Sequence, residues 1–166
     1  METIQKNKIL LFVGFFFLMI SCQDVSEFNQ YKTLEDGSWK SNQDLTFNFE
    51  VKDTIRPKNL FINIRNNNEY EYSNLFIITT LKFPNNTAVI DTLQYEMADE
   101  KGVFLGSGFS SIKENKLFYK EEKVFPTSGN YVLSVKQAMR KNGEINEIKN
   151  LKGILDVGLT IEKINE

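Results

Sequence analysis

The sequence of 166 residues predicts an all-β fold: an antiparallel β-sandwich of about eight strands, jelly-roll-like or immunoglobulin-like. Three observations lead to this prediction. Apolar and polar residues alternate with a period of two in several segments, which is the pattern of strands that bury one face. Residues typical of turns separate these segments. No window of comparable length carries the 3.6-residue period of an amphipathic helix.

The expected strands follow one another along the chain. The clearest alternation covers residues 45–51, where Leu45, Phe47 and Phe49 alternate with polar residues. The same alternation recurs in four further segments, residues 60–65, 92–97, 131–135 and 155–162. Residues 75–83 are apolar on both faces in their first half, which predicts a central strand that is covered on both sides.

Turn chemistry falls between these segments. The turn candidates are Asp36-Gly37, residues 56–59, residues 84–86, residues 127–129 and Asn142-Gly143. Asn142-Gly143, with residues 137–140 before it and 145–148 after it, is the clearest β-hairpin signal, because Asn-Gly favours the two-residue turn that joins hairpin strands.

The first 22 residues have the features of a secretory signal. Lys6 and Lys8 precede an apolar run over residues 9–20, and Ser21 and Cys22 follow it. The run has 12 residues, whereas a membrane-spanning helix needs about 20, so a signal is favoured over a permanent anchor.

A short signal that ends on cysteine resembles a bacterial lipoprotein signal. In that class, cleavage occurs just before the cysteine, whose sulfur and new amino group then carry acyl chains. The small residue required before the cut is present as Ser21, although Met19 stands where leucine is usual. An ordinary signal followed by a free thiol is the alternative. We therefore expect residues 1–21 to be the signal peptide, Cys22 the lipid attachment site, residues 22–30 a tether of at most about 30 Å, and residues 31–166 a single sandwich domain.

Composition excludes several kinds of chemistry. The chain has no histidine, so Ser-His-Asp catalysis and histidine-ligated metal sites are absent. It has one cysteine, which cannot form an intramolecular disulfide or a thiolate zinc site. Removing residues 1–21 takes away Lys6, Lys8 and Glu2, so the net charge moves from −2 to −3. A nucleic-acid partner is not expected, because phosphates demand a basic face.

Several candidate sites have a simpler structural interpretation. Gly106-Ser107-Gly108 lacks the spacing of a phosphate-binding loop, so a plain loop is favoured. Asp99-Glu100 and Glu121-Glu122 could act as hydrolytic carboxylates, but surface positions are favoured in such an acidic chain. Calcium binding is a minor alternative for three scattered aspartates, Asp44, Asp53 and Asp156.

Two aromatic features carry a binding hypothesis. The stretch Asn66–Tyr72 interleaves amides and rings, which suits a sugar- or protein-binding rim, but an asparagine-rich turn between two strands is favoured. Trp39 is expected in the core rather than as a binding platform. Asp53-Thr54-Ile55 and Asp91-Thr92-Leu93 resemble a short O-glycosylation pattern, and the second lies within an expected strand.

Blocks of residues spread along the chain carry a family resemblance. They are residues 28–31, 37–39, 60–68 with Tyr70 and Tyr72, 74–76, 106–109, 113–117, 125–126, 129–131, 139–140 and 153–159. In this order and over almost the whole mature chain they resemble the GldH family of gliding-motility lipoproteins. The resemblance implies a lipid-anchored component of the envelope machinery that moves some bacteria over surfaces, a machinery linked to protein secretion across the outer membrane. It brings no active site with it.

The leading hypothesis is therefore a non-enzymatic envelope lipoprotein, attached to a membrane through Cys22 and contacting other proteins of the motility and secretion machinery. No catalytic residue, cofactor or metal site is expected, and the outer membrane is preferred because glutamine, not aspartate, follows Cys22. The alternative is a lipid-anchored carbohydrate-binding module. An exposed row of coplanar aromatics on a concave face would favour sugar binding, and a flat apolar patch with a polar rim would favour a protein partner.

Overall fold

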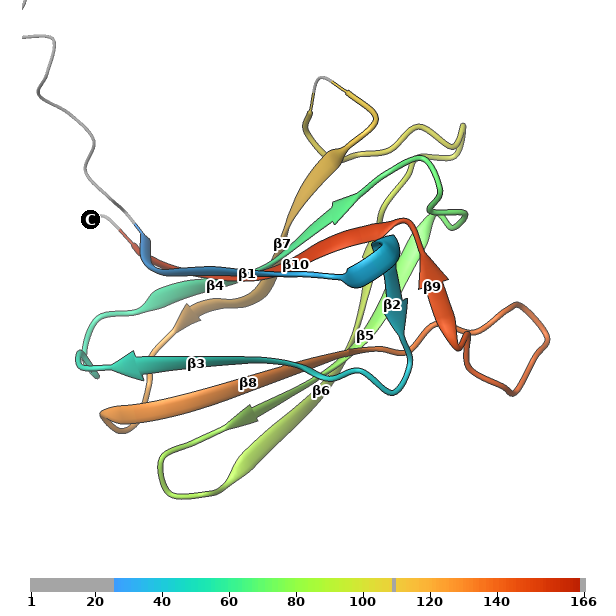
Figure 1. Cartoon of the computed structure of the whole chain (residues 1–166). Helices are drawn as coiled ribbons and strands as arrows, with labels where there is room; N and C mark the ends of the chain where they lie inside the picture. The colour runs from blue at the N-terminus through green and yellow to red at the C-terminus, as the bar shows by residue number, and fades with distance from the viewer. Residues whose placement is uncertain (1–25, 109, 165–166) are drawn as a thin grey trace, which may run out of the picture.

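The computed structural model of the chain describes residues 26–108 and 110–164. Two four-stranded antiparallel sheets lie face to face, and a short two-stranded ladder flanks them (Figure 1). The elements are β1 (Ser26–Thr33), a 3-10 turn η1 (Glu35–Gly37), β2 (Ser38–Lys40), β3 (Leu45–Val51), β4 (Lys58–Asn66), β5 (Asn74–Lys82), β6 (Ala88–Glu96), β7 (Lys113–Lys123), β8 (Gly129–Gln137), β9 (Asn150–Lys152) and β10 (Ile154–Lys163).

The strand order is that of a jelly roll. One sheet has the order β1-β10-β4-β7, the other has the order β3-β8-β5-β6, and β2 pairs with β9. Successive long strands mostly alternate between the two sheets, and the first and last strands, β1 and β10, pair with each other. Eight strands arranged in this way form the double-sheet jelly roll, so the structure selects the first of the two expected topologies.

The core lies between the sheets and follows from the alternation in the sequence. Phe47 of β3, Ile62 of β4 and Leu133 of β8 are fully buried, while their chain neighbours point outward. Aromatic rings fill one end of this core, where Tyr131 stacks on Phe49 with the ring centroids 5.7 Å apart. Burial of these rings is the main stabilising contribution of the core.

The predicted all-β sandwich is confirmed, with differences in the number of strands. The described residues form ten strands, eight in the two main sheets and two in the β2-β9 ladder. β5 lies between β8 and β6, as expected of a central strand, and its outward residues Phe76 and Ile78 are half-buried. Each segment in which apolar and polar residues alternate lies in a strand. The one residue left out is Met97, the last of the expected strand 92–97, which lies just beyond the end of β6.

The predicted hairpin around Asn142-Gly143 is wrong in its strands. A turn forms there, but residues 138–149 are a loop whose pairing is limited to one bridge, between Arg140 and Glu147. The side chain of Gln137 is the physical reason. It donates to the carbonyl of Ile148 over 2.6 Å and accepts from the backbone N–H of Met139 over 2.8 Å, so a side-chain amide occupies groups that a ladder would pair.

The boundary between tether and domain also differs. Residues 26–30, which the sequence analysis assigned to the tether, form the first part of β1 and pair with β10. The signal peptide, Cys22 and the rest of the tether lie outside the described residues. The part of the chain that the structure describes contains no helix with the length and apolar character that a membrane crossing requires.

Candidate protein-interaction surface

The outer face of the β3-β8-β5-β6 sheet is mostly uncharged at its centre. We call its central residues the neutral face: Thr46, Ile78, Thr80, Ile90, Thr92, Val132 and Ser134. The register places them side by side, because Ser134 pairs with Thr46 on one side and with Thr80 on the other, and Thr80 pairs with Ile90. Ile90 is 68% exposed, so the face carries an apolar group that residues 26–108 and 110–164 leave uncovered.

Charged side chains surround the neutral face instead of crossing it. On the same outer side lie Glu50, Lys82, Glu96 and Lys136, each at or near the end of its strand. A surface of aliphatic and hydroxyl groups with charge placed at its rim has the low central charge that is found at protein interfaces. It differs from the apolar patch expected for a protein partner, because four of its seven residues carry hydroxyl groups.

Strand β6 forms an open edge beside the neutral face. The backbone N–H of Met97 donates to the carbonyl of Ser73, and the backbone N–H of Phe83 donates to the carbonyl of Thr87. With the register of the pair, these two bonds show that the odd-numbered residues of β6 form the backbone hydrogen bonds to β5. In an antiparallel pair the alternate residues then direct their backbone groups away from the partner strand. The backbone groups of Ile90 and Thr92 therefore face the free side of β6.

The open edge has one of the features that usually protect such strands, the inward-facing carboxylate of Asp91, which is paired with Lys120 of β7 over 3.0 Å. Residues 88–96 contain no lysine or proline, and their pairing with β5 has no register shift. By contrast, β7, the neighbouring edge of the other sheet, has four lysines and pairs with β4 through two shifts. Weakly protected edges accept an added strand from another chain. The open edge therefore extends the neutral face as a surface for protein contacts.

The outer face of the β1-β10-β4-β7 sheet is polar and internally paired. Tyr31 of β1 crosses over Gly158 of β10 and donates its hydroxyl to Glu114 of β7 over 2.6 Å. Arg65 of β4 lies over the Tyr31 ring, with Cζ 4.3 Å from the centroid, and its Nε donates to Glu114 over 3.1 Å. We call these groups, with Asp156 beside Arg65, the Tyr31 network.

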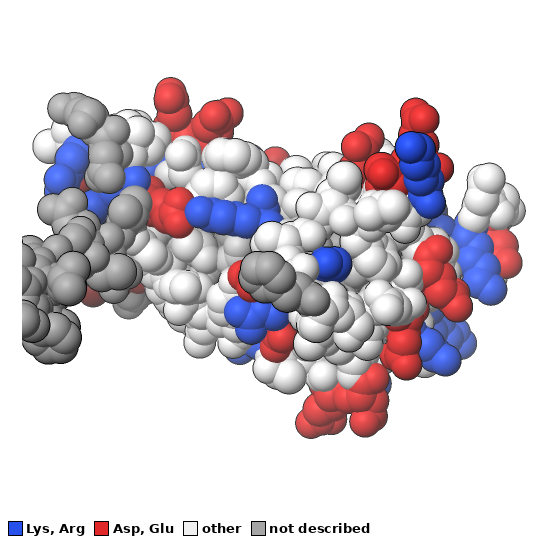
Figure 2. All heavy atoms as spheres, turned by 90° about the horizontal axis from the view of Figure 1, so that it is seen from above, with Lys and Arg blue, Asp and Glu red and all other residues white. Residues whose placement is uncertain are grey.

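The Tyr31 network shifts two pKa values. Burial, with the hydrogen bond to Glu114, raises the pKa of Tyr31 to about 12. The same hydrogen bond, with that from Arg65, lowers the pKa of the Glu114 carboxyl. Because the charges are already paired, this face is suited to holding four strands in register. Figure 2, which looks onto this side of the molecule, shows acidic and basic groups interspersed, with no broad basic field of the kind that nucleic acid requires.

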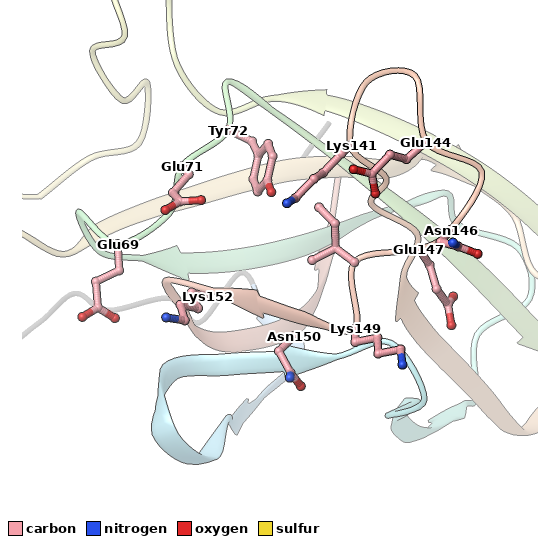
Figure 3. A pocket seen from close by; sticks show the side chains of 11 residues that line it. Glu69, Glu71, Tyr72, Lys141, Glu144, Asn146, Glu147, Lys149, Asn150 and Lys152 are labelled. Atoms are coloured by element: carbon pink, nitrogen blue, oxygen red, sulfur yellow. The ribbon is translucent and has the colours of Figure 1, made fainter.

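A polar hollow lies at the end of the sandwich opposite the start of β1 (Figure 3). The loop after β4, the loop 138–149 and β9 surround it, and Lys141 extends across it toward Tyr72. Its lining residues are Glu69, Glu71, Tyr72, Lys141, Glu144, Asn146, Glu147, Ile148, Lys149, Asn150 and Lys152. Carboxylates and ammonium groups are mixed there, so the hollow offers polar contacts of both signs.

The stretch Asn66–Tyr72 is mainly a structural turn, which was the favoured interpretation. Asn66 is buried and accepts from Asn115, and the side chain of Asn67 accepts from the N–H of Glu69. Tyr70 is 3% exposed and belongs to the core, where it contacts Tyr72 edge to face. Of the two rings in this stretch, Tyr72 is the one that reaches the hollow.

The other single candidates also take structural positions. Trp39 is fully buried, as expected, and donates its indole N–H to the carbonyl of Gln43 over 3.0 Å. The segment 106–108 is a loop, in which Ser107 bridges Glu114 of β7. Thr92, within one glycosylation-like triplet, lies in β6, and Thr54, within the other, lies in the loop between β3 and β4.

The acidic candidates are not brought together. Asp99 accepts the backbone N–H groups of Lys101 and Val103 within its own turn, and Glu121-Glu122 lie on β7. The three aspartates named for calcium are also separate: Asp53 accepts from the backbone N–H of Ile55 in the loop between β3 and β4, Asp44 precedes β3, and Asp156 lies in β10. Among the described residues, no three His, Cys, Asp or Glu side chains are grouped so that they could hold a metal ion.

The row of aromatics that would favour sugar binding is not found. Phe118 is the only exposed aromatic side chain in residues 26–108 and 110–164, and it packs on the buried ring of Phe61 at 4.4 Å between centroids. The described surface therefore lacks the row of coplanar rings named above as the feature that would favour a carbohydrate.

Fold and surface together define a jelly-roll β-sandwich with one charge-rimmed sheet face and an open edge strand. A family model described as GldH lipoprotein matches residues 26–161. The chain belongs to the GldH lipoprotein family. It is 43% identical over 155 residues to a protein of Christiangramia forsetii described as a gliding motility lipoprotein GldH homolog, covering 93% of this chain and 94% of that protein.

A second relative extends the match. The gliding motility lipoprotein GldH of Flavobacterium johnsoniae is 39% identical over 160 residues, which covers 96% of this chain and 98% of that protein. Solved structures show weaker similarity. The VP2 subviral particle of infectious bursal disease virus matches with a TM-score of 0.35 and 14% identity, over 87% of this chain and 36% of that chain. A family 16 carbohydrate-binding module matches with a TM-score of 0.25 and 11% identity, over 77% and 72%.

Proposed function

We propose that this protein is a non-enzymatic, lipid-anchored component of the bacterial gliding machinery, and that it is attached to the outer membrane through acyl chains on Cys22. Membership of the GldH lipoprotein family and the names of its two relatives support this proposal. The sequence Ser21-Cys22 after a short apolar run supplies the attachment point. Two or three acyl chains on one cysteine would hold the domain at the membrane in effect permanently.

The neutral face is the part of the domain that contacts another envelope protein of the motility and secretion machinery. The single observation that carries this step is the distribution of charge on the β3-β8-β5-β6 sheet, whose centre is aliphatic and hydroxylic and whose charged residues stand at the strand ends. A partner can cover this surface without burying an unpaired charge, which is the condition for a stable interface.

Substitutions on the neutral face test this function directly. The gene is deleted in a gliding host and restored with the wild type, with Ile90→Glu or with the control Val103→Glu. Ile90 is 68% exposed and Val103 is 61% exposed, so both variants should fold, but only the first places a charge on the neutral face, beside Thr80. We expect Ile90→Glu to abolish restored movement and secretion and Val103→Glu to restore both.

The same strains are used to identify the partner. Affinity capture through the anchored wild type should recover an envelope protein that the Ile90→Glu variant loses at equal abundance. Full movement and unchanged capture with Ile90→Glu would contradict the role of the neutral face. Normal movement and secretion in the strain that lacks the gene would contradict the proposed function as a whole.

A further inference from the structure

The sandwich has an end that must lie close to the proposed lipid anchor. Ser26, the first described residue, begins β1 at this end and stands four positions after Cys22. Four extended residues reach at most about 14 Å. β1 begins here beside the end of β10 and the start of β4 (Figure 1). We call this end of the molecule the anchor end.

The most prominent apolar group at the anchor end is Ile55. It lies in the loop 52–57 between β3 and β4 and is 83% exposed. The carboxylate of Asp53 accepts the backbone N–H groups of Ile55 and Arg56 over 2.9 and 3.2 Å, so the loop has a defined shape that projects Ile55. Lys52 precedes it and Arg56 follows it, with side chains that are 82% and 70% exposed. Each side chain is also paired with a carboxylate, Lys52 with Glu50 over 3.5 Å and Arg56 with Asp53.

Basic residues also line the rim of the adjoining sheet. Lys163 at the end of β10 pairs in register with Lys58 at the start of β4, and Lys58 pairs with Lys123 at the end of β7. Glu27 is bonded to Lys58 over 2.6 Å and lies 3.7 Å from Lys163, so this carboxylate is already neutralised. The Lys58 side chain is only 3% exposed, so Lys163 and Lys123 are the lysines of this rim that reach the solvent. Two exposed acids, Glu121 and Glu122, directly precede Lys123 on β7.

These features match a phospholipid surface. Long basic side chains on either side of an exposed aliphatic residue can place their charges at the phosphate level while the aliphatic group enters the interface. The anchor keeps the local concentration of lipid high, so even a weak contact is populated. A loop with a fixed shape also loses little conformational freedom when it docks.

We infer that the anchor end docks on the bilayer that holds the acyl chains, with Ile55 in the headgroup region and Lys52 and Arg56 against lipid phosphates. This inference rests on the proposed lipidation of Cys22. It fixes an orientation, because the strands then rise from the membrane and carry the polar hollow about 30 Å away from it. The neutral face stands beside the strands and is open to a neighbouring envelope protein.

A pair of exposed isoleucines at opposite ends of the domain tests this orientation. Ile55→Cys and Ile145→Cys each place a thiol at a position of nearly equal exposure, 83% and 87%, and Ile145 lies in the loop 138–149 beside the polar hollow. Each full-length, membrane-extracted protein is labelled with the same polarity-sensitive fluorophore. The proteins are then reconstituted in vesicles of phosphatidylethanolamine and phosphatidylglycerol that contain lipids spin-labelled near the headgroup.

We expect the probe at position 55 to be quenched at least twofold more than the probe at position 145, and its emission to be shifted to the blue. Adding Lys52→Glu to the Ile55→Cys variant should reduce this quenching in the anionic vesicles. Equal quenching at both positions would overturn the docking. The wild type is the control for the anchor, because acylated Cys22 takes up no label; a labelled wild type would overturn the lipidation, and the docking that depends on it.

Discussion

The contact between Tyr31 and Gly158 gives a quantitative test of how the polar sheet face is held. A Cβ atom at position 158 would lie 2.8 Å from Cδ1 and 2.9 Å from Cε1 of the Tyr31 ring, so Gly158→Ala must lift the ring. The lifted ring loses its hydrogen bond to Glu114 and its contact with Arg65. We therefore expect Gly158→Ala to destabilise the domain although alanine normally suits a strand better than glycine.

The magnitude follows from the contacts at stake. A hydrogen bond to a charged group contributes about 1.5–3 kcal/mol, and a partly exposed cation–π contact about 0.5–1 kcal/mol. Replacing glycine in a strand returns about 0.5–1 kcal/mol. Gly158→Ala should therefore lower the free energy of unfolding by about 1–3.5 kcal/mol. In a Tyr31→Ala background the ring is gone, and the same substitution should be neutral or stabilise by up to about 0.5–1 kcal/mol.

Urea unfolding of all four chains measures this coupling. Trp39, the single tryptophan, is fully buried, so its fluorescence reports loss of the core. Each chain also carries Cys22→Ser, so that the four are compared without a lipid. An equal effect of Gly158→Ala in both backgrounds would refute the reasoning, because it would place the cost in the backbone and not in the ring.

Three further predictions concern glycines and pH. Gly153→Ala should prevent stable folding, because φ is +80° there and an added Cβ would lie 2.1 Å from the backbone nitrogen of Tyr70. Gly143 has a similar φ of +81° but open space around it, so Gly143→Ala should lower the free energy of unfolding by only about 1 kcal/mol. Thermal unfolding followed by circular dichroism would compare the two variants. Since the pKa of Glu114 is lowered on folding, its contribution to the free energy of unfolding is present above its ordinary pKa of 4.5 and is lost as the pH falls below it. Tyr31→Phe removes one of the bonds that lower this pKa, so it should reduce the fall in unfolding free energy at acid pH, measured by urea titrations between about pH 3 and 6. An unchanged fall would contradict the pairing of Tyr31 with Glu114. Since the pKa of Tyr31 is raised to about 12, its contribution is present below pH 10 and is lost as the pH rises toward 12, and phenolate absorbance should show this delayed ionisation.

The strands that bury one regular face could be predicted from the sequence. Residues 45–51 alternate strictly, and β3 covers the same residues. β7 was missed because lysine and glutamate occur on both of its faces and its pairing with β4 has two register shifts, which break the period. The first five residues of β1, residues 26–30, were assigned to the tether because they are mostly polar, and their membership of the sheet depends on pairing with β10 at the other end of the chain.

The interaction surface required strand order and register as well as pattern. The outward positions of β5 and β6 alternate in the sequence, but nothing local shows that Thr80 lies between Ile90 and Ser134. The Tyr31 network joins residues 83 positions apart, and no short motif marks it. The turn at Asn142-Gly143 formed as its residue types indicate, and the flanking strands did not, because the Gln137 side chain bonds the backbone in their place.

The most direct test of the central claim is the mass of the mature N-terminus. Membrane-extracted protein is digested with a protease, and its N-terminal peptide is analysed by mass spectrometry in an organic phase that retains acylated peptides. The account predicts a peptide that begins at Cys22, with cleavage after Ser21 and the added mass of acyl chains on the cysteine. A mature chain that begins elsewhere, or that begins at Cys22 with a free thiol, would contradict the account.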